Sequence, residues 1–145
     1  MAILIDTNVL LRLLQPHHPH CHVVQRALST LRTNNETLYV TAQNLVEFGA
    51  VATRPTSDNG LGMTGEVAKR ELDVFRRLFV LLPESNSIFE EWERLVTTYE
   101  VCGKNTHDAR LVAAMNVYGI TGIVTFNVRD FAPYSNISAL HPDTI

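Results

Sequence analysis

No apolar run in this sequence is long enough to cross a lipid bilayer, so we expect no membrane anchor. The chain enters the apolar stretch Ile3–Ile5 directly, without the basic region or cleavage site of a secretory signal. Cysteine is scarce: Cys21 and Cys102 are too few for a disulfide framework and are not spaced as joint metal ligands. These absences predict a cytoplasmic protein with two free thiols.

Positive charge is not in excess either. The formal net charge is −3, so the total charge does not favour a polyanion as partner, although ten of the twelve cations are arginines that could hold one locally. The length of 145 residues fits a single domain, 1–145, and the apolar fraction of 46% and charged fraction of 19% are those of an ordinary globular protein.

The chain is organised around the stretch from Ile3 to Leu10. Its apolar run ends abruptly in Asp6, Thr7 and Asn8, and apolar residues then resume. This pattern predicts a short strand buried on both faces, followed by a helix that begins at Val9 with Asn8 as its N-cap. Asp6 then lies at the carboxyl end of a central strand, where open α/β sheets bind their ligands. A plain capping or turn role for Asp6 explains the residue equally well.

Strand and helix patterns alternate along the rest of the chain. We expect further strands at 38–40, 80–82 and 123–125, an edge strand at 139–141, and helices over 9–14, 20–32, 43–53, 64–79, 87–99 and 105–118. Thr41 is the expected N-cap of the helix over 43–53, and Ser87 with Glu90 forms a capping-box pattern. The alternation predicts a three-layer α/β/α domain with a central, mostly parallel sheet of four to five short strands.

Glu47 is the only acid of the helix over 43–53, in which apolar residues lie nearly all round. We therefore expect this helix to be largely covered by protein, with Gly49 packed closely against another backbone. An ionised carboxylate in such a place is unfavourable without a partner. Glu47 thus needs a metal ion, its own proton or an arginine, and Arg54 is the arginine within reach.

Further polar and acidic groups follow the later elements. Asp108 falls in the first turn of the helix over 105–118, where the helix dipole alone would favour a carboxylate. Asn127 and Asp130 come just after the strand at 123–125. In a parallel sheet these places open on one edge, so the acids could converge there with Asp6 and Glu47. Converging carboxylates stay ionised only around a divalent metal, and all-oxygen ligands suit Mg²⁺ or Mn²⁺.

Four histidines and one cysteine are crowded into residues 17–22, which suggests a zinc site. Two prolines, Pro16 and Pro19, mark the same segment as a loop. A solvated turn that leads into the next helix is the simpler interpretation.

Taken together, these motifs resemble the PIN domain family, and within it the VapC-type toxin ribonucleases of bacterial toxin–antitoxin pairs. The resemblance spans nearly the whole chain and rests on four motifs in the right order: Ile5-Asp6-Thr7-Asn8, Leu45-Val46-Glu47-Phe48, His107-Asp108-Ala109 and Thr125-Phe126-Asn127-Val128-Arg129-Asp130-Phe131. Each motif is weak alone, and the four in register are specific.

The resemblance implies a metal-dependent endoribonuclease of α/β/α architecture that cleaves RNA. The metal-binding acids at matching positions would be Asp6, Glu47 and Asp108, with Thr7, Asn8 and Thr125 as polar supports. Many relatives carry an acid where Asn127 stands, so either Asp130 or Asn127 completes the site, directly or through a water. The number of metal ions stays open.

The implied reaction is hydrolysis of a phosphodiester by a metal-activated water, which leaves 5′-phosphate and 3′-hydroxyl ends. Asp6 and Asp108 would hold the principal Mg²⁺, and Glu47 would bind it too or position the water. Positive side chains that could contact the RNA backbone, or pair with the acids instead, are Arg12, Arg110 and Arg129. The family also implies an antitoxin partner and a homodimer.

Two other classes fit parts of the pattern. A phosphotransferase of the haloacid-dehalogenase kind also places an Asp after its first strand, but normally needs a second Asp where Asn8 stands. A PIN-like module that binds RNA without cleaving it would follow if Asn127 disables the site. A stable acyl-phosphate on Asp6 would identify the first, and RNA binding without cleavage under any divalent metal would identify the second.

Overall fold

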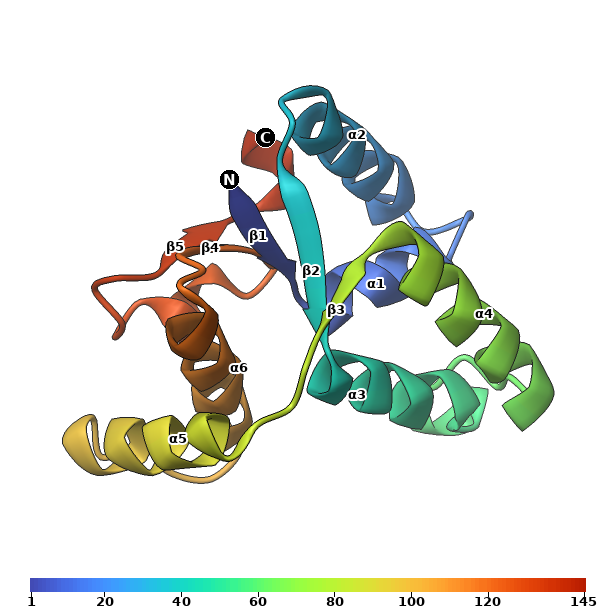
Figure 1. Ribbon diagram of the computed structural model, residues 1–145. Coiled ribbons are helices and arrows are strands. Elements are labelled where there is room, and N and C mark those ends of the chain that lie inside the picture. The colour runs from blue at the N-terminus through green and yellow to red at the C-terminus, as the bar shows by residue number, and fades with distance from the viewer.

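Five parallel strands form the centre of the computed structural model, which describes residues 1–145 (Figure 1). They are β1 (Ala2–Ile5), β2 (Thr37–Thr41), β3 (Val80–Leu82), β4 (Gly122–Val124) and β5 (Ser138–Leu140). Their order in the sheet is β3-β2-β1-β4-β5, and every pairing is parallel. All five carboxyl ends therefore lie at one edge, with β1 in the middle. The expectation of a mostly parallel sheet of four to five short strands is confirmed.

Six helices cover the two faces of the sheet. They are α1 (Thr7–Leu13), α2 (His20–Thr33), α3 (Ala42–Thr53), α4 (Gly65–Leu78), α5 (Asn86–Thr98) and α6 (Asn105–Tyr118). Helices α1 to α4 lie on one side of the sheet and α5 with α6 on the other (Figure 1). Short 3₁₀ turns, η1 (Thr56–Asp58), η2 (Val128–Phe131) and η3 (Pro142–Thr144), complete the chain. None of the helices has the length and apolar character that a membrane span requires.

The core lies in two clusters, one on each face of the sheet. Ile3 and Ile5 of β1 point into the cluster with α1 to α4, whereas Leu4 points into the cluster with α5 and α6. Successive strand residues face opposite sides, so a strand covered on both faces must be apolar at every position. This is why the run before Asp6 has no polar residue.

The start of α1 differs from the expectation. The helix begins at Thr7, and its N-cap is Asp6, whose side chain accepts a hydrogen bond from the Thr7 N–H. Asn8 was expected in that role, but its side chain reaches across the sheet instead. Its Oδ1 accepts the Phe126 N–H at 3.2 Å, and its Nδ2 lies 3.3 Å from the Thr125 hydroxyl. A partner distant in sequence has replaced the local cap.

Other helix ends test the local rules of capping. Thr41 caps α3 in a complete capping box with Asn44, as expected of Thr41. The predicted box between Ser87 and Glu90 is wrong, because α5 begins at Asn86 and its N-cap, Ser85, makes no side-chain capping bond. The end of α6 at Gly119 is confirmed, since this glycine adopts φ 68°, the left-handed conformation.

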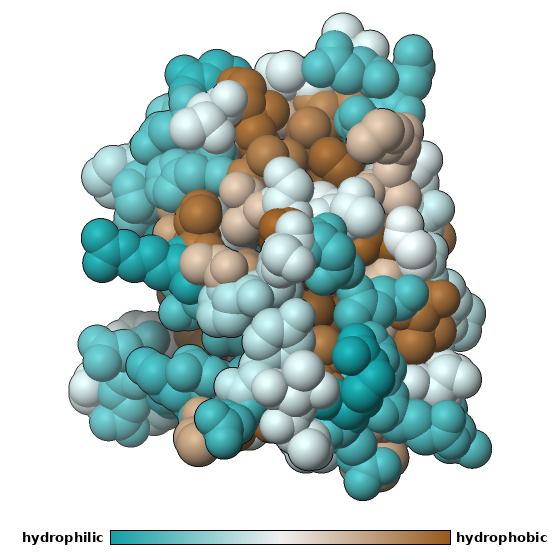
Figure 2. Space-filling model, turned by 90° about the vertical axis from the view of Figure 1, so that its left-hand side faces the viewer, coloured by the Kyte–Doolittle hydropathy of each residue, from teal (hydrophilic) through white to brown (hydrophobic).

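The surface carries no single dominant apolar face on the side that Figure 2 presents. Hydrophilic residues cover most of that face, and the hydrophobic residues gather in smaller patches among them (Figure 2). The large apolar side chains that remain exposed come from several elements, among them Val46 of α3, Val80 of β3 and Phe89 of α5.

Candidate active site

Asp6 occupies the carboxyl end of β1 and is nearly buried, with 6% of its surface exposed. Its Oδ1 accepts the Thr7 N–H at 2.7 Å, and its Oδ2 accepts the Thr125 hydroxyl at 2.7 Å and the Asn8 amide at 3.3 Å. Burial raises the pKa of Asp6 above its ordinary value, and the bonds from Thr125 and Thr7 oppose that rise. The carboxylate is held in one orientation by neutral donors.

The groups that hold Asp6 also join β1 to β4. Thr125, fully buried, accepts hydrogen bonds from the Asn8 amide at 3.3 Å and from the Asn127 N–H at 3.0 Å. Thr7 accepts the Asn44 amide at 3.2 Å and so ties α1 to the first turn of α3. The three predicted supports, Thr7, Asn8 and Thr125, therefore lie together around Asp6. Asn44 belongs to the same network through Thr7, and it was not among the residues predicted from the sequence.

Glu47 lies half-buried on α3, one turn after Gln43. Its Oε1 accepts the Gln43 amide at 2.7 Å, and no ion pair involves it. The expected alternative of a salt bridge with Arg54 is wrong, because that guanidinium turns to the backbone oxygen of Asp58 at 3.5 Å. No cation of the protein therefore pairs with Glu47.

Gln43 connects α3 to α6, and it was not among the site residues predicted from the sequence. Its Nε2 also donates to the His107 carbonyl at 2.8 Å, while its Oε1 accepts from Arg110 at 3.3 Å. The other terminal nitrogen of the Arg110 guanidinium donates to Glu84 Oε2 at 2.6 Å. The available signal was the spacing of four residues to Glu47, which places two side chains on one helix face.

Asp108 lies half-buried in the first turn of α6 and has no hydrogen-bond partner on its carboxylate within the protein. Burial, followed by the negative charges of Asp6, Asp130 and Glu47, raises its pKa from 3.8 to about 7, while Lys104 acts in the opposite direction. The three other acids are thus close enough to act on Asp108 electrostatically. The predicted convergence of these acids at one end of the sheet is present.

A hollow of about 350 Å³, which we name the acid recess, opens between these side chains. It is lined by Glu47, Lys104, His107, Asp108, Asn127 and Asp130, none of them hydrophobic. Asp6 does not line the recess, but the charge of this buried residue contributes to raising the pKa of Asp108. Lys104 and His107 were not singled out in the sequence.

The donors of the acid recess suit a hard divalent cation in their chemistry. None of Asp6, Glu47, Asp108 and Asp130 takes part in an ion pair, so their mutual repulsion is not offset by a neighbouring arginine. As they lie, however, no three acidic, histidine or cysteine side chains are arranged closely enough to hold a metal ion. The site therefore supplies the ligand type that Mg²⁺ or Mn²⁺ requires in a wider arrangement than a coordination shell.

The crowded histidines do not form the zinc site that the sequence suggested. No metal-binding group occurs among residues 17–22 as they lie. His20 instead stacks on Phe126, with ring centroids 4.7 Å apart, and its backbone N–H donates to His18 Nδ1 at 3.1 Å. The solvated turn is the better description, and it packs against the segment that follows β4.

The three arginines expected near the site have different surroundings. Arg12 donates to Gln15 at 2.7 Å, and Arg110 pairs with Glu84, so neither pairs with a carboxylate of the acid recess. Arg129 is exposed on η2 and makes no ion pair. It remains the arginine beside Asp130 whose charge is not used within the protein.

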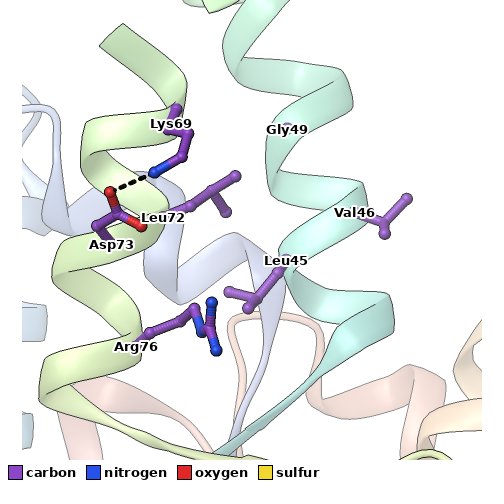
Figure 3. Close-up of a pocket in the computed structure, with 7 residues that line it drawn as sticks. All are labelled: Leu45, Val46, Gly49, Lys69, Leu72, Asp73 and Arg76. Atoms are coloured by element: carbon purple, nitrogen blue, oxygen red, sulfur yellow. Dashed lines mark hydrogen bonds and ion pairs between the residues drawn. The ribbon is translucent and has the colours of Figure 1, made fainter. Parts of the chain in front are cut away.

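Helix α3 is less covered than expected, because Phe48 and Ala52 are buried in the core with Leu45 packed against it, whereas Val46 and Ala50 are exposed. Toward α4 it borders a groove of about 340 Å³ in which Leu45 and Leu72 approach each other, while Val46 points away (Figure 3). The expected close packing at Gly49 is also wrong, since a Cβ there would meet nothing within 4 Å.

Comparison with protein families supplies an independent match. The family model described as the PIN domain matches residues 3–135 of the chain. A comparison with curated proteins found no significant match.

Solved structures share the fold over nearly the full length of both chains. VapBC2 from Rickettsia felis bound to a promoter DNA fragment has a TM-score of 0.74 and 17% identity, covering 97% of this chain and 98% of the other. VapBC-1 from nontypeable Haemophilus influenzae has a TM-score of 0.72 and 14% identity, covering 98% of each chain. VapC20 from Mycobacterium tuberculosis, a toxin that cleaves the sarcin-ricin loop, has a TM-score of 0.63 and 18% identity, covering 91% of this chain and 95% of the other.

Proposed function

The chain belongs to the PIN domain family, and from that premise we propose that it is a metal-dependent endoribonuclease that hydrolyses RNA phosphodiester bonds. The observation that carries the proposal is the convergence of four acids from separate elements. Their mutual repulsion contributes to raising the pKa of Asp108 to about 7, and no arginine pairs with any of them. Such a cluster is unfavourable for the isolated fold, which is typical of a site arranged for a cation.

Asp6 and Asp108 would hold the principal ion, Glu47 would bind it or position the attacking water, and Asn127 or Asp130 would complete the shell. When bound, Mg²⁺ or Mn²⁺ supplies a water of lowered pKa and offsets the charge that builds on the phosphate. Thr125 and the Thr7 N–H keep the Asp6 carboxylate in one orientation, and so spare the site a rearrangement during the reaction.

Two residues outside the acid set would assist. Gln43 holds Glu47 at 2.7 Å while also bound to the His107 carbonyl at 2.8 Å, and thereby sets the distance between α3 and the first turn of α6. Lys104 lines the acid recess and makes no ion pair. Its ammonium group is therefore free to contact the negatively charged backbone of an RNA strand.

The test is RNA cleavage in the presence of Mg²⁺ or Mn²⁺ by the wild type and by Asp6→Asn. We expect the variant to lose at least about a hundredfold in rate, the scale on which a single stabilising group acts in a transition state. Glu93→Gln, at an exposed acid of α5, is the matched control and should cleave normally. Equal rates for the wild type and Asp6→Asn would refute the proposal.

We also propose that the protein is the toxin of a VapBC-like pair, with a protein antitoxin, a homodimeric state and a cytoplasmic location. The similarity to VapBC2 and VapBC-1, and to a structure of a toxin–antitoxin complex from Klebsiella pneumoniae, supports the partner. Expression of the wild type should arrest growth, and expression of Asp6→Asn should not. Arrest by both proteins would speak against a toxin that acts through this site.

The two other classes explain less of the geometry. The haloacid-dehalogenase chemistry needs a second acid at position 8, where the Asn8 side chain is engaged with Thr125 and Phe126. A module that binds RNA without cleaving it agrees with the wide arrangement of the acids, but it does not explain why they converge without ion pairs.

A further inference from the structure

A second hollow adjoins the acid recess and shares Asp130 with it. This aromatic recess, as we name it, has a volume of about 310 Å³ and lies between the segment that connects α5 to α6 and the turn η2. Its principal lining residues are Tyr99, Glu100, Asn105, Arg129, Asp130 and Tyr134. Pockets for small ligands in proteins start at roughly 300 Å³, so the recess is large enough for one planar base.

The two recesses adjoin at Asp130, and Tyr134 lines the aromatic recess alone. This buried ring meets the ring of Tyr99 edge to face, with centroids 5.1 Å apart. Burial and then the charge of Asp108 raise the pKa of Tyr134, so its hydroxyl lies within electrostatic reach of the acid recess. A ligand in the aromatic recess would therefore lie directly beside the proposed reaction centre.

The chemistry of the aromatic recess combines the ring of Tyr99 with one cation, Arg129, and two carboxylates, Glu100 and Asp130. Tyr99 is 40% exposed, and its ring is inclined at 62° to the buried ring of Tyr134. Arg129 is exposed without an ion pair, and the exposed Asn105 side chain makes no hydrogen bond in the protein. Aromatic rings bind unstacked bases, and arginine binds phosphate, which is how single-stranded nucleic acid is held elsewhere.

We propose that the aromatic recess binds the nucleotide next to the scissile phosphodiester of a single-stranded RNA, with its base against Tyr99 and its phosphate on Arg129. This inference rests on the proposed nuclease function and names the form of its substrate. A base in a duplex is stacked and paired, so it could not enter the recess. The protein would therefore select unpaired segments and loops.

The experiment measures binding of a fluorescently labelled single-stranded RNA by anisotropy in EDTA, where cleavage is suppressed. We expect Tyr99→Leu to bind about tenfold more weakly, on the scale of one lost base–aromatic stack, and Tyr99→Phe to bind like the wild type. Phe89→Leu, which removes an exposed ring from α5, is the matched control and should bind normally. Arg129→Ala should lower the slope of log affinity against log salt by about 1.

Each result has one consequence. Unchanged binding by Tyr99→Leu overturns the aromatic recess as a binding site, even where the wild type cleaves RNA. Tyr99-dependent binding without any cleavage refutes the nuclease proposal and retains the recess. A free mononucleotide that competes as well as the RNA strand overturns the assignment to a strand. Thermal unfolding of every variant is recorded, and if Tyr99→Leu does not fold, an unchanged salt slope in Arg129→Ala overturns the proposal.

Discussion

Asp6 and Asp108 are the same kind of side chain on two sides of one site, and their surroundings are opposite. Asp6, at the end of β1, receives three hydrogen bonds, from Thr7, Asn8 and Thr125. Asp108, at the start of α6, receives none within the protein, and its pKa is raised to about 7. Hydrogen bonds within the protein thus orient Asp6 at the end of β1. Asp108 at the start of α6 has no such donor and is open to a cation or a substrate.

This difference implies separate roles for Asp6 and Asp108 in the site. A carboxylate held by neutral donors keeps its position whether or not a ligand is present. A carboxylate that is partly buried beside other acids costs stability until a cation binds to it. The two sides should therefore respond differently to substitution, and three variants test this, beginning with the largest effect.

Replacing Asp108 should separate activity from stability. We expect Asp108→Asn to cleave RNA at least about a hundredfold more slowly, as Asp6→Asn does, because each removes a charge that holds the ion. The folded state raises the Asp108 pKa from 3.8 to about 7, so the folded protein binds this proton more tightly than the unfolded chain does. In EDTA this group therefore costs the wild type stability as pH rises from about 4 to about 7, and the loss is complete above 7.

Urea unfolding at several pH values in EDTA checks the stability half of this prediction. Asp108→Asn should be more stable than the wild type near neutral pH, and the advantage should shrink toward pH 4. Glu93→Gln, at an exposed acid of α5 that forms no ion pair, should show no such pH-dependent advantage. If Asp108→Asn and the wild type are equally stable at all pH values, the folded state does not raise the Asp108 pKa.

Removing the Thr125 hydroxyl should free the Asp6 carboxylate from its fixed orientation. Thr125→Val keeps the shape of the side chain but takes from Asp6 the bond of 2.7 Å, and from the Asn127 N–H its acceptor at 3.0 Å. We expect cleavage to fall roughly 10- to 100-fold and stability to fall by about 1–3 kcal/mol. Rate measurements and urea unfolding beside Thr97→Val, an exposed position on α5, check both values. A normal rate would show that the fold holds Asp6 without this hydroxyl.

The smallest effect concerns α3, the helix that carries Glu47. A Cβ at Gly49 would meet nothing within 4 Å, so Gly49→Ala should stabilise the protein by about 0.5–1 kcal/mol and leave cleavage unchanged. Gly119→Ala, where φ is 68°, should instead destabilise it by about 1–2 kcal/mol. Thermal unfolding compares the two. Slower cleavage by Gly49→Ala would mean that Glu47 needs a flexible helix.

Much of the fold follows from local patterns. The unbroken apolar run before Asp6 predicts a strand covered on both faces, which β1 is. Thr41 and Gly119 mark helix ends because capping and left-handed backbone are properties of one or two residues. Asn8 shows the limit of this reasoning: it is a good cap by composition, yet Phe126 and Thr125 offer it partners across the sheet.

The set of acids could be listed from the sequence, but their partners could not. Glu47 was expected to need a metal ion, its own proton or Arg54, and the Arg54 alternative was wrong because that guanidinium contacts the backbone oxygen of Asp58. Gln43 was missed because its role depends on the His107 carbonyl, 64 residues away. The aromatic recess was missed for the same reason, since Tyr99 and Tyr134 belong to different segments that only packing brings together.

Local patterns in the sequence predict the order of strands and helices, the buried strand before Asp6 and a set of acids as candidate metal ligands. Periodicity and composition act over a few neighbouring residues, so they can be recognised without a structure. The contact between Thr125 and Asp6 across 119 positions, the absence of an arginine paired with the acids and the aromatic recess beside them became visible only in the folded chain. Hydrogen bonds and charge repulsion depend on distances in space, and parallel strands with long crossovers make those distances unrelated to separation along the chain.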